Sequence, residues 1–309
     1  MEFKHKSVLL NETIEGLNIK QNGIYVDGTI GLAGHSSEIL KRIPDGFLYG
    51  FDQDDFAVGE SNLRLSEISD NFKIIRDNFS NMKAVLNDLG IDKVDGILLD
   101  LGVSSPQIDN DERGFSFMRD AELDMRMDNR NKLTAKKVVN EYSLEELTNI
   151  FYSFGEEKFS KTIAKGIVLY RKDKVINTTL ELVKIIEDSV PKKYFVTKHP
   201  ERQIFQAIRI EVNSELSVLN KVLPDAIDLL KKGGRLCVIT FHSLEDRIVK
   251  KIFKKYSEVD EIVKGMPSIP DEYKPIVKLV NHKPIVASDS EIGLNSRSKS
   301  AKLRIIERL

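Results

Sequence analysis

Residues 95–109 read DGILLDLGVSSPQID, and this stretch decides the fold class. An apolar run, 97–99, ends at a single carboxylate, Asp100, and a small polar turn follows it, with Gly102, Ser104, Ser105, Pro106 and Gln107. An apolar strand with an acid at its carboxyl end is typical of open α/β sheets, whose ligands bind outside those strand ends. The turn offers hydroxyls and an amide but no strong nucleophile and no cluster of metal ligands. We therefore expect a site that positions a polar group rather than attacking one.

Strand and helix patterns alternate on both sides of this segment. In the first third we expect strands at 24–27, 47–51, 72–75 and 94–101, with a helix at 36–42 whose N-cap is Ser36. Strands separated by helical segments predict βαβ units and a parallel sheet. After a helix at 219–230 and a Gly233–Gly234 turn, the strand pattern returns at 235–241, 283–287 and 301–308.

The middle of the chain lacks strand alternation. Residues 109–130 are polar, and Ser143 to Glu146 form a capping-box sequence that opens a helix. Leu147, Ile150, Phe151 and Phe154 then follow the i, i+3, i+4, i+7 spacing of one helix face. We therefore predict one α/β domain, residues 1–108 and 207–309, interrupted by a helical insertion at 109–206.

Composition narrows the class of protein. A chain of 309 residues with 41% hydrophobic residues supports a large packed core, and no apolar run approaches the roughly 18 residues of a membrane span. The start of the chain lacks the apolar segment of a secretory signal, and its single cysteine, Cys237, lies in an apolar run typical of a core. Cytoplasmic location and no membrane partner are the expectation.

The net charge of −1 does not favour a nucleic-acid-binding protein, but the charges are unevenly distributed. Residues 158–202 hold 11 Lys and Arg against 5 Asp and Glu, and residues 295–304 hold 4 basic residues and no acid. Local basic patches of this kind can contact phosphates in a chain that is neutral overall.

The loop after the first predicted strand, residues 26–36, reads VDGTIGLAGHS. Its G-x-x-G-x-x-G spacing fits the G-x-G-x-x-G dinucleotide fingerprint poorly, although a helix N-terminus behind glycines is a good place for an anionic or polar ligand. An ordinary strand–helix turn has the same appearance. However, Asp27, Asp52 and Asp100 all fall at predicted strand ends, and this coincidence favours a ligand that contains a nucleoside.

Histidine spacing gives no metal signal. A single histidine that opens a helix, such as His35, is more often a hydrogen-bonding cap than a catalyst. The five histidines show no ligand spacing with one another, so we predict no zinc or other metal site.

Ordered blocks over nearly the whole chain resemble the bacterial 16S rRNA cytidine N4-methyltransferase family, which uses S-adenosyl-L-methionine. The blocks are HKSVLL (5–10), DGTIGLAGHS (27–36), LLDLGVSSPQID (98–109), RGFSF (113–117), LDMRMD (123–128), FQAIRIEVNSEL (205–216), FHSLEDRIVK (241–250) and NSRSKSAKLR (295–304). The chain departs from the family at Leu32 and Ala33, where glycine is usual, and at Ala121–Glu122, where the family has Gly-Pro. These departures concern loop geometry.

The resemblance implies a doubly wound, Rossmann-like class I methyltransferase fold with an inserted helical domain for substrate recognition. It implies methylation of a specific cytidine in the decoding region of 16S rRNA, within the small ribosomal subunit, and it permits a homodimer. Carried over by position, the cofactor contacts are Ala33, Gly34, His35, Asp52, Phe79, Asp100 and Gln107. From the residues alone, core packing is the preferred interpretation of Phe79.

The implied chemistry assigns roles to the opening stretch. The cytosine amine is a poor nucleophile, so the protein must align it with the methyl group and accept a hydrogen bond from it. Other amino-directed methyltransferases place an acid or amide followed by prolines at the same strand end, and Asp100 with Ser104 and Ser105 resembles that arrangement. The resemblance therefore implies that these three are the catalytic residues. Asp100 can serve the cofactor, the amine or both, and its role stays open here.

RNA must also be held, and the target base must be exposed. The predicted backbone contacts are Arg297, Lys299, Lys302 and Arg304. Lysines and arginines at 161–174 are weaker candidates, because each by itself is best explained as part of a solvated helix face. For Arg113, Arg126, Arg209 and Glu211, structural salt bridges are the alternative to a functional role.

Two other functions remain open. A ribosome-assembly factor that binds rRNA without catalysis is disfavoured by the intact Asp100 and Gln107. An NAD-dependent oxidoreductase is disfavoured by the glycine spacing of the first loop.

Overall fold

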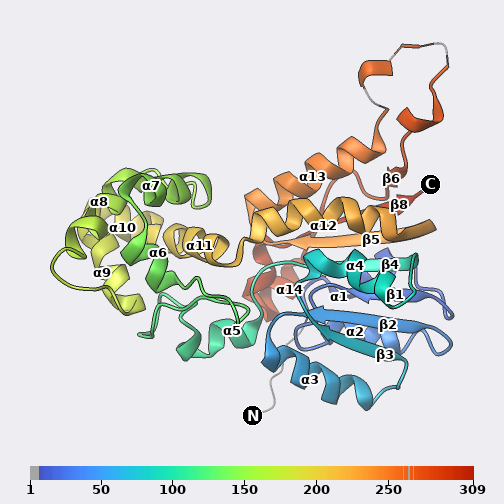
Figure 1. Cartoon of the computed structure of the whole chain (residues 1–309), viewed down its shortest axis with the longest axis horizontal. Coiled ribbons are helices and arrows are strands. Elements are labelled where there is room, and N and C mark those ends of the chain that lie inside the picture. Colours follow the sequence, from blue (N-terminus) through green and yellow to red (C-terminus); the bar gives the residue numbers. More distant parts are fainter. Residues whose placement is uncertain (1–6, 260, 264, 267) are drawn as a thin grey trace. The chain divides into compact units, whose positions relative to one another are not determined.

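The computed structural model describes residues 7–259, 261–263, 265–266 and 268–309. The chain forms two compact units (Figure 1). The sheet unit comprises residues 1–102 and 216–309, and the helical unit comprises residues 103–215. The helical unit thus extends beyond the predicted 109–206 at both ends. At its carboxyl end the reason is helix α11 (Pro200–Asn213), whose Ile208 and Val212 are buried in the helical unit's own core.

The sheet unit is built on one mixed sheet whose strands follow the order β3-β2-β1-β4-β5-β8-β6, with β7 paired to β8. The pairs among β1 to β5 are parallel, whereas β8 runs antiparallel to β5, β6 and β7. This confirms the predicted doubly wound α/β class. The strands are β1 (Ile24–Asp27), β2 (Phe47–Asp52), β3 (Phe72–Arg76), β4 (Val94–Asp100), β5 (Leu230–Thr240), β6 (Val277–Leu279), β7 (Ile285–Val286) and β8 (Lys302–Arg308).

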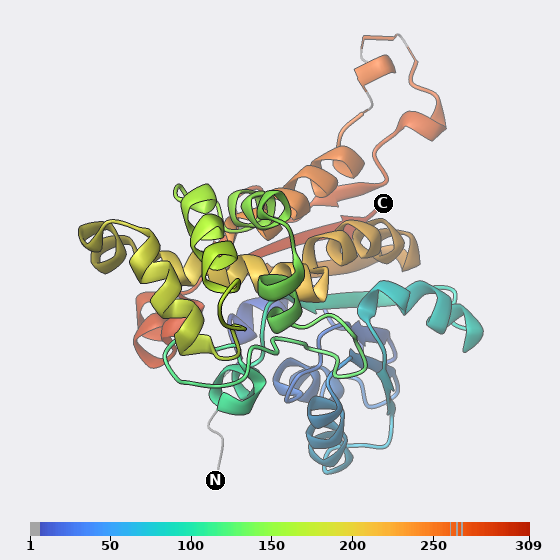
Figure 2. The same ribbon diagram turned by 60° about the vertical axis from the view of Figure 1, so that its left-hand side comes forward.

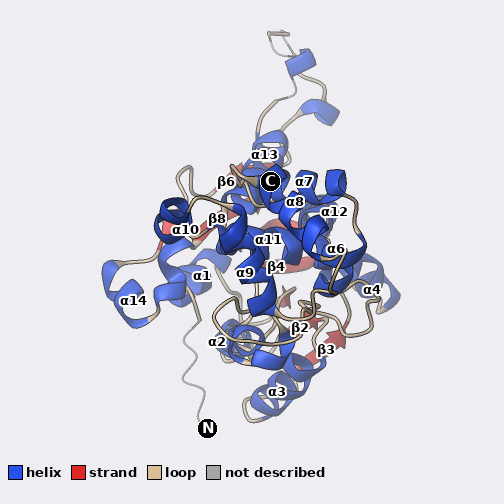
Figure 3. Cartoon of the chain, turned by 90° about the vertical axis from the view of Figure 1, so that its left-hand side faces the viewer, coloured by secondary structure: helices blue, strands red, loops and turns tan. Residues whose placement is uncertain are grey.

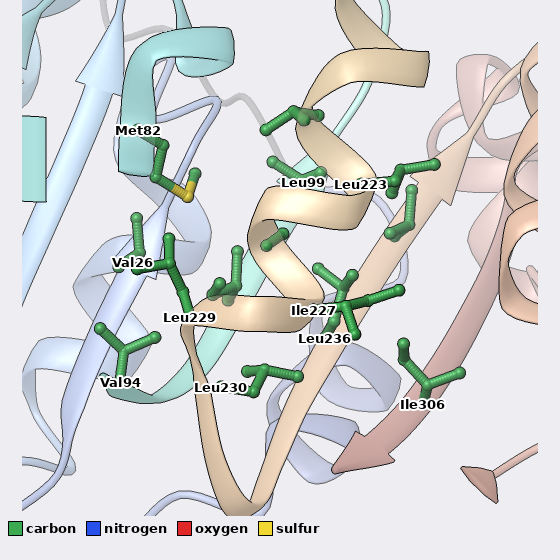
Figure 4. Packing of buried hydrophobic residues seen from close by; sticks show 14 of the residues in the cluster. Val26, Met82, Val94, Leu99, Leu223, Ile227, Leu229, Leu230, Leu236 and Ile306 are labelled. Carbon is green, nitrogen blue, oxygen red and sulfur yellow. The ribbon is translucent and has the colours of Figure 1, made fainter. Parts of the chain in front are cut away.

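Helices cover both faces of this sheet, because alternate strand residues point to opposite sides. Leu99 and Leu236 belong to the cluster with helices α4 (Met82–Asp88), α12 (Glu215–Leu229) and α13 (Ser243–Ser257). In Figure 4, Leu223 and Ile227 of α12 lie against these strand residues. Leu98 and Cys237 belong to the opposite cluster, with α1 (Leu10–Leu17), α2 (Gly34–Leu40) and α3 (Asp55–Ser66). Cys237 is a buried free thiol, as predicted, and burial raises its pKa.

The helical unit contains α5 (Ser105–Asp109), α6 (Ala135–Glu141), α7 (Leu144–Ser153), α8 (Ser160–Tyr170), α9 (Thr179–Ser189), α10 (Lys192–Lys198) and α11 (Figure 3). The predicted capping box opens α7: the Ser143 hydroxyl accepts from the Glu146 N–H, and Glu146 accepts from the Ser143 N–H. Leu147, Ile150 and Phe151 are buried on one face, as their spacing predicts.

The remaining regular elements are short. Helix α14 spans Asp289–Leu294, and 3-10 turns occupy Phe79–Asn81, Asp111–Arg113, Glu261–Val263, Asp271–Tyr273 and Ser296–Ser300. Within the described residues, every helix is too short or too polar to cross a lipid bilayer.

Two local predictions were wrong, and one strand was not predicted. Helix α2 begins at Gly34 rather than at a Ser36 N-cap: its N-cap is Ala33, and the Ser36 hydroxyl instead donates to Asp27 at 2.6 Å. The Gly233–Gly234 turn does not precede β5 but lies within it, as an irregularity in the β4–β5 register. Strand β6 was missed, because three residues are too few to show an alternating pattern.

Candidate functional site

The site forms where β1 and β4 lie side by side. The chain leaves β1 towards β2 and β3 on one side, and it continues from β4 to β5 on the other. Such a reversal of strand order opens a crevice at the carboxyl ends of the two strands, where open α/β sheets bind ligands. Asp27 ends β1 and Asp100 ends β4.

The loop after β1 is tied to both neighbouring strands, first to β4 and then to β2. The Gly28 N–H donates to the Leu98 carbonyl at 2.9 Å, and the Asp100 N–H donates to the Thr29 hydroxyl at 2.7 Å. On the other side, the Ile30 N–H donates to the Phe51 carbonyl and the Gly31 N–H to the Asp52 carboxylate, at 3.0 and 2.9 Å. The loop therefore holds the ends of β2 and β4 in fixed positions on either side of β1.

Two glycines of this loop are required by space. A Cβ on Gly28 would lie 2.5 Å from the Leu99 side chain, and one on Gly34 would lie 1.9 Å from the Ser7 hydroxyl. Ala33 adopts a left-handed φ of 56°, a conformation that costs a residue with a Cβ. That geometry explains why the related family prefers glycine at this position.

The carboxyl group of Asp100 is only partly satisfied. Its Oδ1 atom is buried and has no hydrogen-bond partner within the described residues, while Oδ2 lies 3.6 Å from Nδ1 of His35. Burial, with further contributions from the charges of Asp27 and Glu245, raises the pKa of Asp100 well above its ordinary value. A carboxyl group in this state is prepared to accept a hydrogen bond or a proton at Oδ1.

His35 is buried in the first turn of α2, where its Nε2 lies 3.1 Å from the Val8 carbonyl oxygen. A carbonyl only accepts hydrogen bonds, so the proton of the neutral ring belongs on Nε2. The ring is thereby fixed with Nδ1 towards Asp100. His35 is not the helix cap that the sequence suggested, because the N-cap of α2 is Ala33 and no side chain caps the helix.

Asp52, at the end of β2, accepts backbone hydrogen bonds from Gly31 and Asp54, both at 2.9 Å. Burial away from water raises the pKa of Asp52 to about 6, although the two backbone hydrogen bonds act in the opposite direction and lower it. Phe79 follows β3 and is partly buried against the hydrophobic cluster of α4 and α12. A Cβ on Gly28 would lie 3.3 Å from the Cβ of Phe79, so Phe79 lies next to the loop as well as the core.

The sheet unit therefore brings together six predicted site residues: Ala33, Gly34, His35, Asp52, Phe79 and Asp100. Ser104, Ser105 and Gln107 belong to the beginning of the helical unit. There Gln107 is buried, and its side-chain oxygen accepts from the Ser104 N–H at 3.0 Å. The side chain of Ser105 lies outside the described part of the structure.

Sequence analysis missed two residues of the carboxyl edge, Glu245 and His242. Glu245 is 3% exposed, and its Oε2 accepts from the N–H groups of Phe241 and His242 at the start of α13. The imidazole of His242 lies 3.2 Å from Oε1 of Glu245. The sequence does contain a signal for both residues. His242 and Glu245 have the spacing of a capping box, which opens helix α13 directly after β5.

The predicted RNA-contacting residues divide into two pairs. Arg297 and Lys299 are exposed in the 3-10 turn before β8. Arg304 is 11% exposed and forms two hydrogen bonds to Asp246 of α13, at 2.7 and 3.2 Å, and Lys302 approaches the same carboxylate at 3.4 Å. Arg304 is therefore held in a structural ion pair between β8 and α13.

The charged residues of the helical unit that lie in the resembling sequence blocks also have structural partners. Arg126 is held by the Asp124 carboxylate and by two loop carbonyls, and Arg209 pairs with Glu215 through two bonds of 2.8 and 2.9 Å. Glu211 accepts from the Tyr142 hydroxyl at 2.7 Å. Salt bridges therefore account for Arg126 and Arg209, whereas Glu211 is held by a hydroxyl and Arg113 donates to the Arg126 carbonyl.

Comparisons with known proteins add independent findings. The profile of the MraW methylase family matches residues 2–309. A protein of Exiguobacterium sibiricum, named ribosomal RNA small subunit methyltransferase H, is 52% identical over 308 residues, 99% of each chain. A protein of the same name from Finegoldia magna is 51% identical over 311 residues, all of both chains. An rRNA methylase structure from Streptococcus thermophilus aligns with 100% of this chain and 99% of its own, at 12% identity and a TM-score of 0.43, which is too weak a likeness to support an argument.

Proposed function

This chain belongs to the MraW methylase family, and from that membership we propose that it methylates N4 of a cytidine in the 16S rRNA of the small ribosomal subunit. The methyl donor is S-adenosyl-L-methionine. The observation that carries the proposal is the full-length relationship together with the unpartnered Asp100 oxygen at the β1–β4 crevice. The reaction belongs in the cytoplasm, where ribosomal subunits are found, and a homodimer is compatible with it.

The residues present fit this donor. An adenosyl group brings ribose hydroxyls, and the Asp52 carboxylate stands at the end of β2, where such hydroxyls are commonly bound. Gly28 and Gly34 have no room for a side chain, so at these two positions the loop presents main-chain groups to a ligand. The partly buried ring of Phe79 offers an apolar surface beside that loop. Ala33, Gly34, His35, Asp52, Phe79, Asp100 and Gln107 are accordingly the proposed cofactor contacts.

When bound, the sulfonium supplies an activated methyl group, so the protein's task is alignment and proton handling. In the transfer, a C–N bond forms as the C–S bond breaks, and N4 then carries a proton that it must lose. We assign Oδ1 of Asp100 to the amine: the carboxylate accepts a hydrogen bond from N4–H and is positioned to take the released proton. Its raised pKa makes it a more effective acceptor than an ordinary carboxylate.

The helical unit, with Ser104, Ser105 and Gln107 at its start, is the proposed substrate-recognition domain. Arg297 and Lys299 are the better candidates for backbone contacts within the tail, because both are exposed. Lys302 is half-buried beside Asp246 and is a weaker candidate, and Arg304 is weaker still.

The test uses labelled S-adenosylmethionine and small ribosomal subunits that lack the modification. Label is expected in N4-methylcytidine after digestion of the rRNA to nucleosides. Label on ring carbon 5 or on a ribose would contradict the amine assignment. Tight binding to subunits without any transfer of label would favour the assembly-factor function instead.

A further inference from the structure

Helix α13, orange in Figure 2, has a row of exposed cations that the proposed chemistry does not use. Arg247, Lys250, Lys251, Lys254 and Lys255 are all exposed, and we call these five residues the basic stripe. Their spacing of i, i+3, i+4, i+7, i+8 places them on one helix face. At 1.5 Å per residue, the stripe extends about 12 Å along the helix.

The opposite face of α13 is occupied. Leu244, Val249 and Phe253 are buried, and Ile248 and Ile252 pack against the hydrophobic cluster of the sheet. The helix therefore presents charge to solvent and keeps its apolar face for the core. A partner at this surface must be recognised by negative charge, not by an apolar groove or by insertion into a bilayer.

The stripe costs the helix stability. Three like-charge pairs stand at i, i+4 spacing, 247/251, 250/254 and 251/255, and each is unfavourable by roughly 0.2–0.5 kcal/mol. Lys184 of α9, in contrast, has two acidic partners within its own helix, Glu187 and Asp188. The helix dipole favours cations in the last turn, which accounts for Lys254 and Lys255 but not for the cations before them.

Acids nearby do little to balance the stripe. Glu258 lies 3.7 Å from Lys254, and both side chains are exposed, so this pair is weak. Asp246, in the first turn, is already bound to Arg304 at 2.7 Å. Glu245 is buried and accepts from the N–H groups that precede the helix. Among the described residues, the four lysines of the stripe (Lys250, Lys251, Lys254 and Lys255) therefore have only this one weak acidic partner.

The stripe also begins close to the catalytic edge of the sheet unit. Helix α13 starts three residues after the end of β5, and the charge of Glu245 in its first turn contributes to the raised pKa of Asp100.

We propose that the basic stripe binds the phosphate backbone of the substrate RNA, beyond the nucleotide that is methylated. The inference rests on the proposed function, because it assumes that the polyanion is RNA.

The test compares two sets of four substitutions in the full-length protein. The stripe variant replaces Lys250, Lys251, Lys254 and Lys255 by Gln. The matched control replaces Lys41, Lys73, Lys93 and Lys232 by Gln; these are exposed lysines of the same unit outside α13, so the change in net charge is the same. A third variant carries Arg at the four stripe positions and keeps the charge.

For the stripe variant, binding to unmethylated small subunits is expected to weaken roughly tenfold or more, with the slope of log K against log salt smaller by about 3. The control and the Arg variant should remain close to the wild type. Equal loss in the stripe and control variants, or an unchanged salt slope, would overturn the inference. Loss of binding to phosphatidylserine vesicles with unchanged RNA binding would point to a membrane instead and would also overturn it.

Direct binding separates this inference from the proposed function. If the wild type transferred no methyl group to the subunits, the proposed function would fail, yet the comparison of RNA affinities would still decide the role of the stripe. The stripe variant should unfold at no lower a temperature than the wild type, because it removes like-charge pairs, and the affinity for S-adenosylhomocysteine should be the same in all variants. These two results exclude misfolding as the cause of a weaker RNA affinity.

Discussion

Nδ1 of His35 lies 3.6 Å from Oδ2 of Asp100, while Nε2 of the same ring lies 3.1 Å from the Val8 carbonyl oxygen. The carbonyl keeps a proton on Nε2, so a favourable contact with Asp100 requires a second proton, either on the carboxyl or on the ring. His35 thus joins the N-terminal turn of α2 to the carboxyl group at the end of β4.

The first prediction concerns the pH dependence of methyl transfer. Because Asp100 must be ionised to accept the amine, and its pKa is raised, kcat should fall on the acid side at a pH well above the ordinary titration range of an aspartate. The measurement is a pH–rate profile at saturating cofactor and substrate. A profile that stays flat down to pH 5 would rule out this role for Asp100.

A second prediction separates the two partners that Asp100 can have. If Oδ1 serves the amine, Asp100→Asn should lower kcat by about 100-fold or more and change the Kd of S-adenosylhomocysteine by only a few fold. Asp92→Asn, at an exposed position before β4, is the matched control and should leave both values unchanged. A large loss of cofactor affinity in Asp100→Asn would assign the carboxylate to the cofactor instead.

The third prediction follows from the pKa of about 6 for Asp52. A raised carboxyl pKa contributes stability below the unfolded value, near 4, and that contribution is lost as the pH rises through 6. Ribose hydroxyls that donate to the ionised carboxylate recover part of the loss. S-adenosylhomocysteine should therefore bind up to roughly tenfold more tightly at pH 7 than at pH 5.

Calorimetric titrations at the two pH values test this, and binding near pH 6 should release a proton. The dependence should disappear in Asp52→Asn and persist in Asp100→Asn. Equal affinities at pH 5 and pH 7 in the wild type would contradict the assignment of Asp52 to the cofactor.

The fourth prediction concerns the loop geometry. Gly28→Ala should destabilise the protein by about 1–3 kcal/mol, because the new methyl group would lie 2.5 Å from the Leu99 side chain in a packed core. Gly59→Ala, within α3 and with open space around it, should stabilise by about 0.5–1 kcal/mol. Urea unfolding measures both values. A neutral Gly28→Ala variant would mean that the loop has more room than its contacts indicate.

Much of this site was predictable because its signals are local. Each acid at a strand end follows a short apolar run, so Asp27, Asp52 and Asp100 could be placed at one edge of the sheet before their contacts were known. The parallel order of the strands follows from the alternation of strand and helix. The start of α2 could not be predicted in this way, because it depends on a left-handed Ala33 and on a Ser36 hydroxyl that Asp27 draws away from the helix end.

Non-local pairing explains the other differences. Glu245 influences Asp100 only because β5 lies beside β4, and no spacing within the sequence reveals that contact. Arg304 is similar: it stands in a basic tail that resembles an RNA-binding segment, yet its partner is Asp246, 58 residues earlier. A sequence pattern shows which charges are present, whereas folding decides which of them remain available.

The fifth prediction tests that distinction. Arg304→Gln should destabilise the protein by about 3 kcal/mol, because Asp246, which is largely buried, would lose its main partner. Replacing Arg297 and Lys299 by Gln should leave stability unchanged, since both are exposed, but should weaken RNA binding and reduce its salt dependence. Urea unfolding and RNA titrations on the same variants give the two readouts.

The Asp246→Asn variant removes the other half of the ion pair. The Arg304→Gln/Asp246→Asn double variant should therefore lose less free energy of unfolding than the two single variants lose in sum. Simple additivity would show that the ion pair does not connect β8 to α13 and would return Arg304 to the RNA-contacting set.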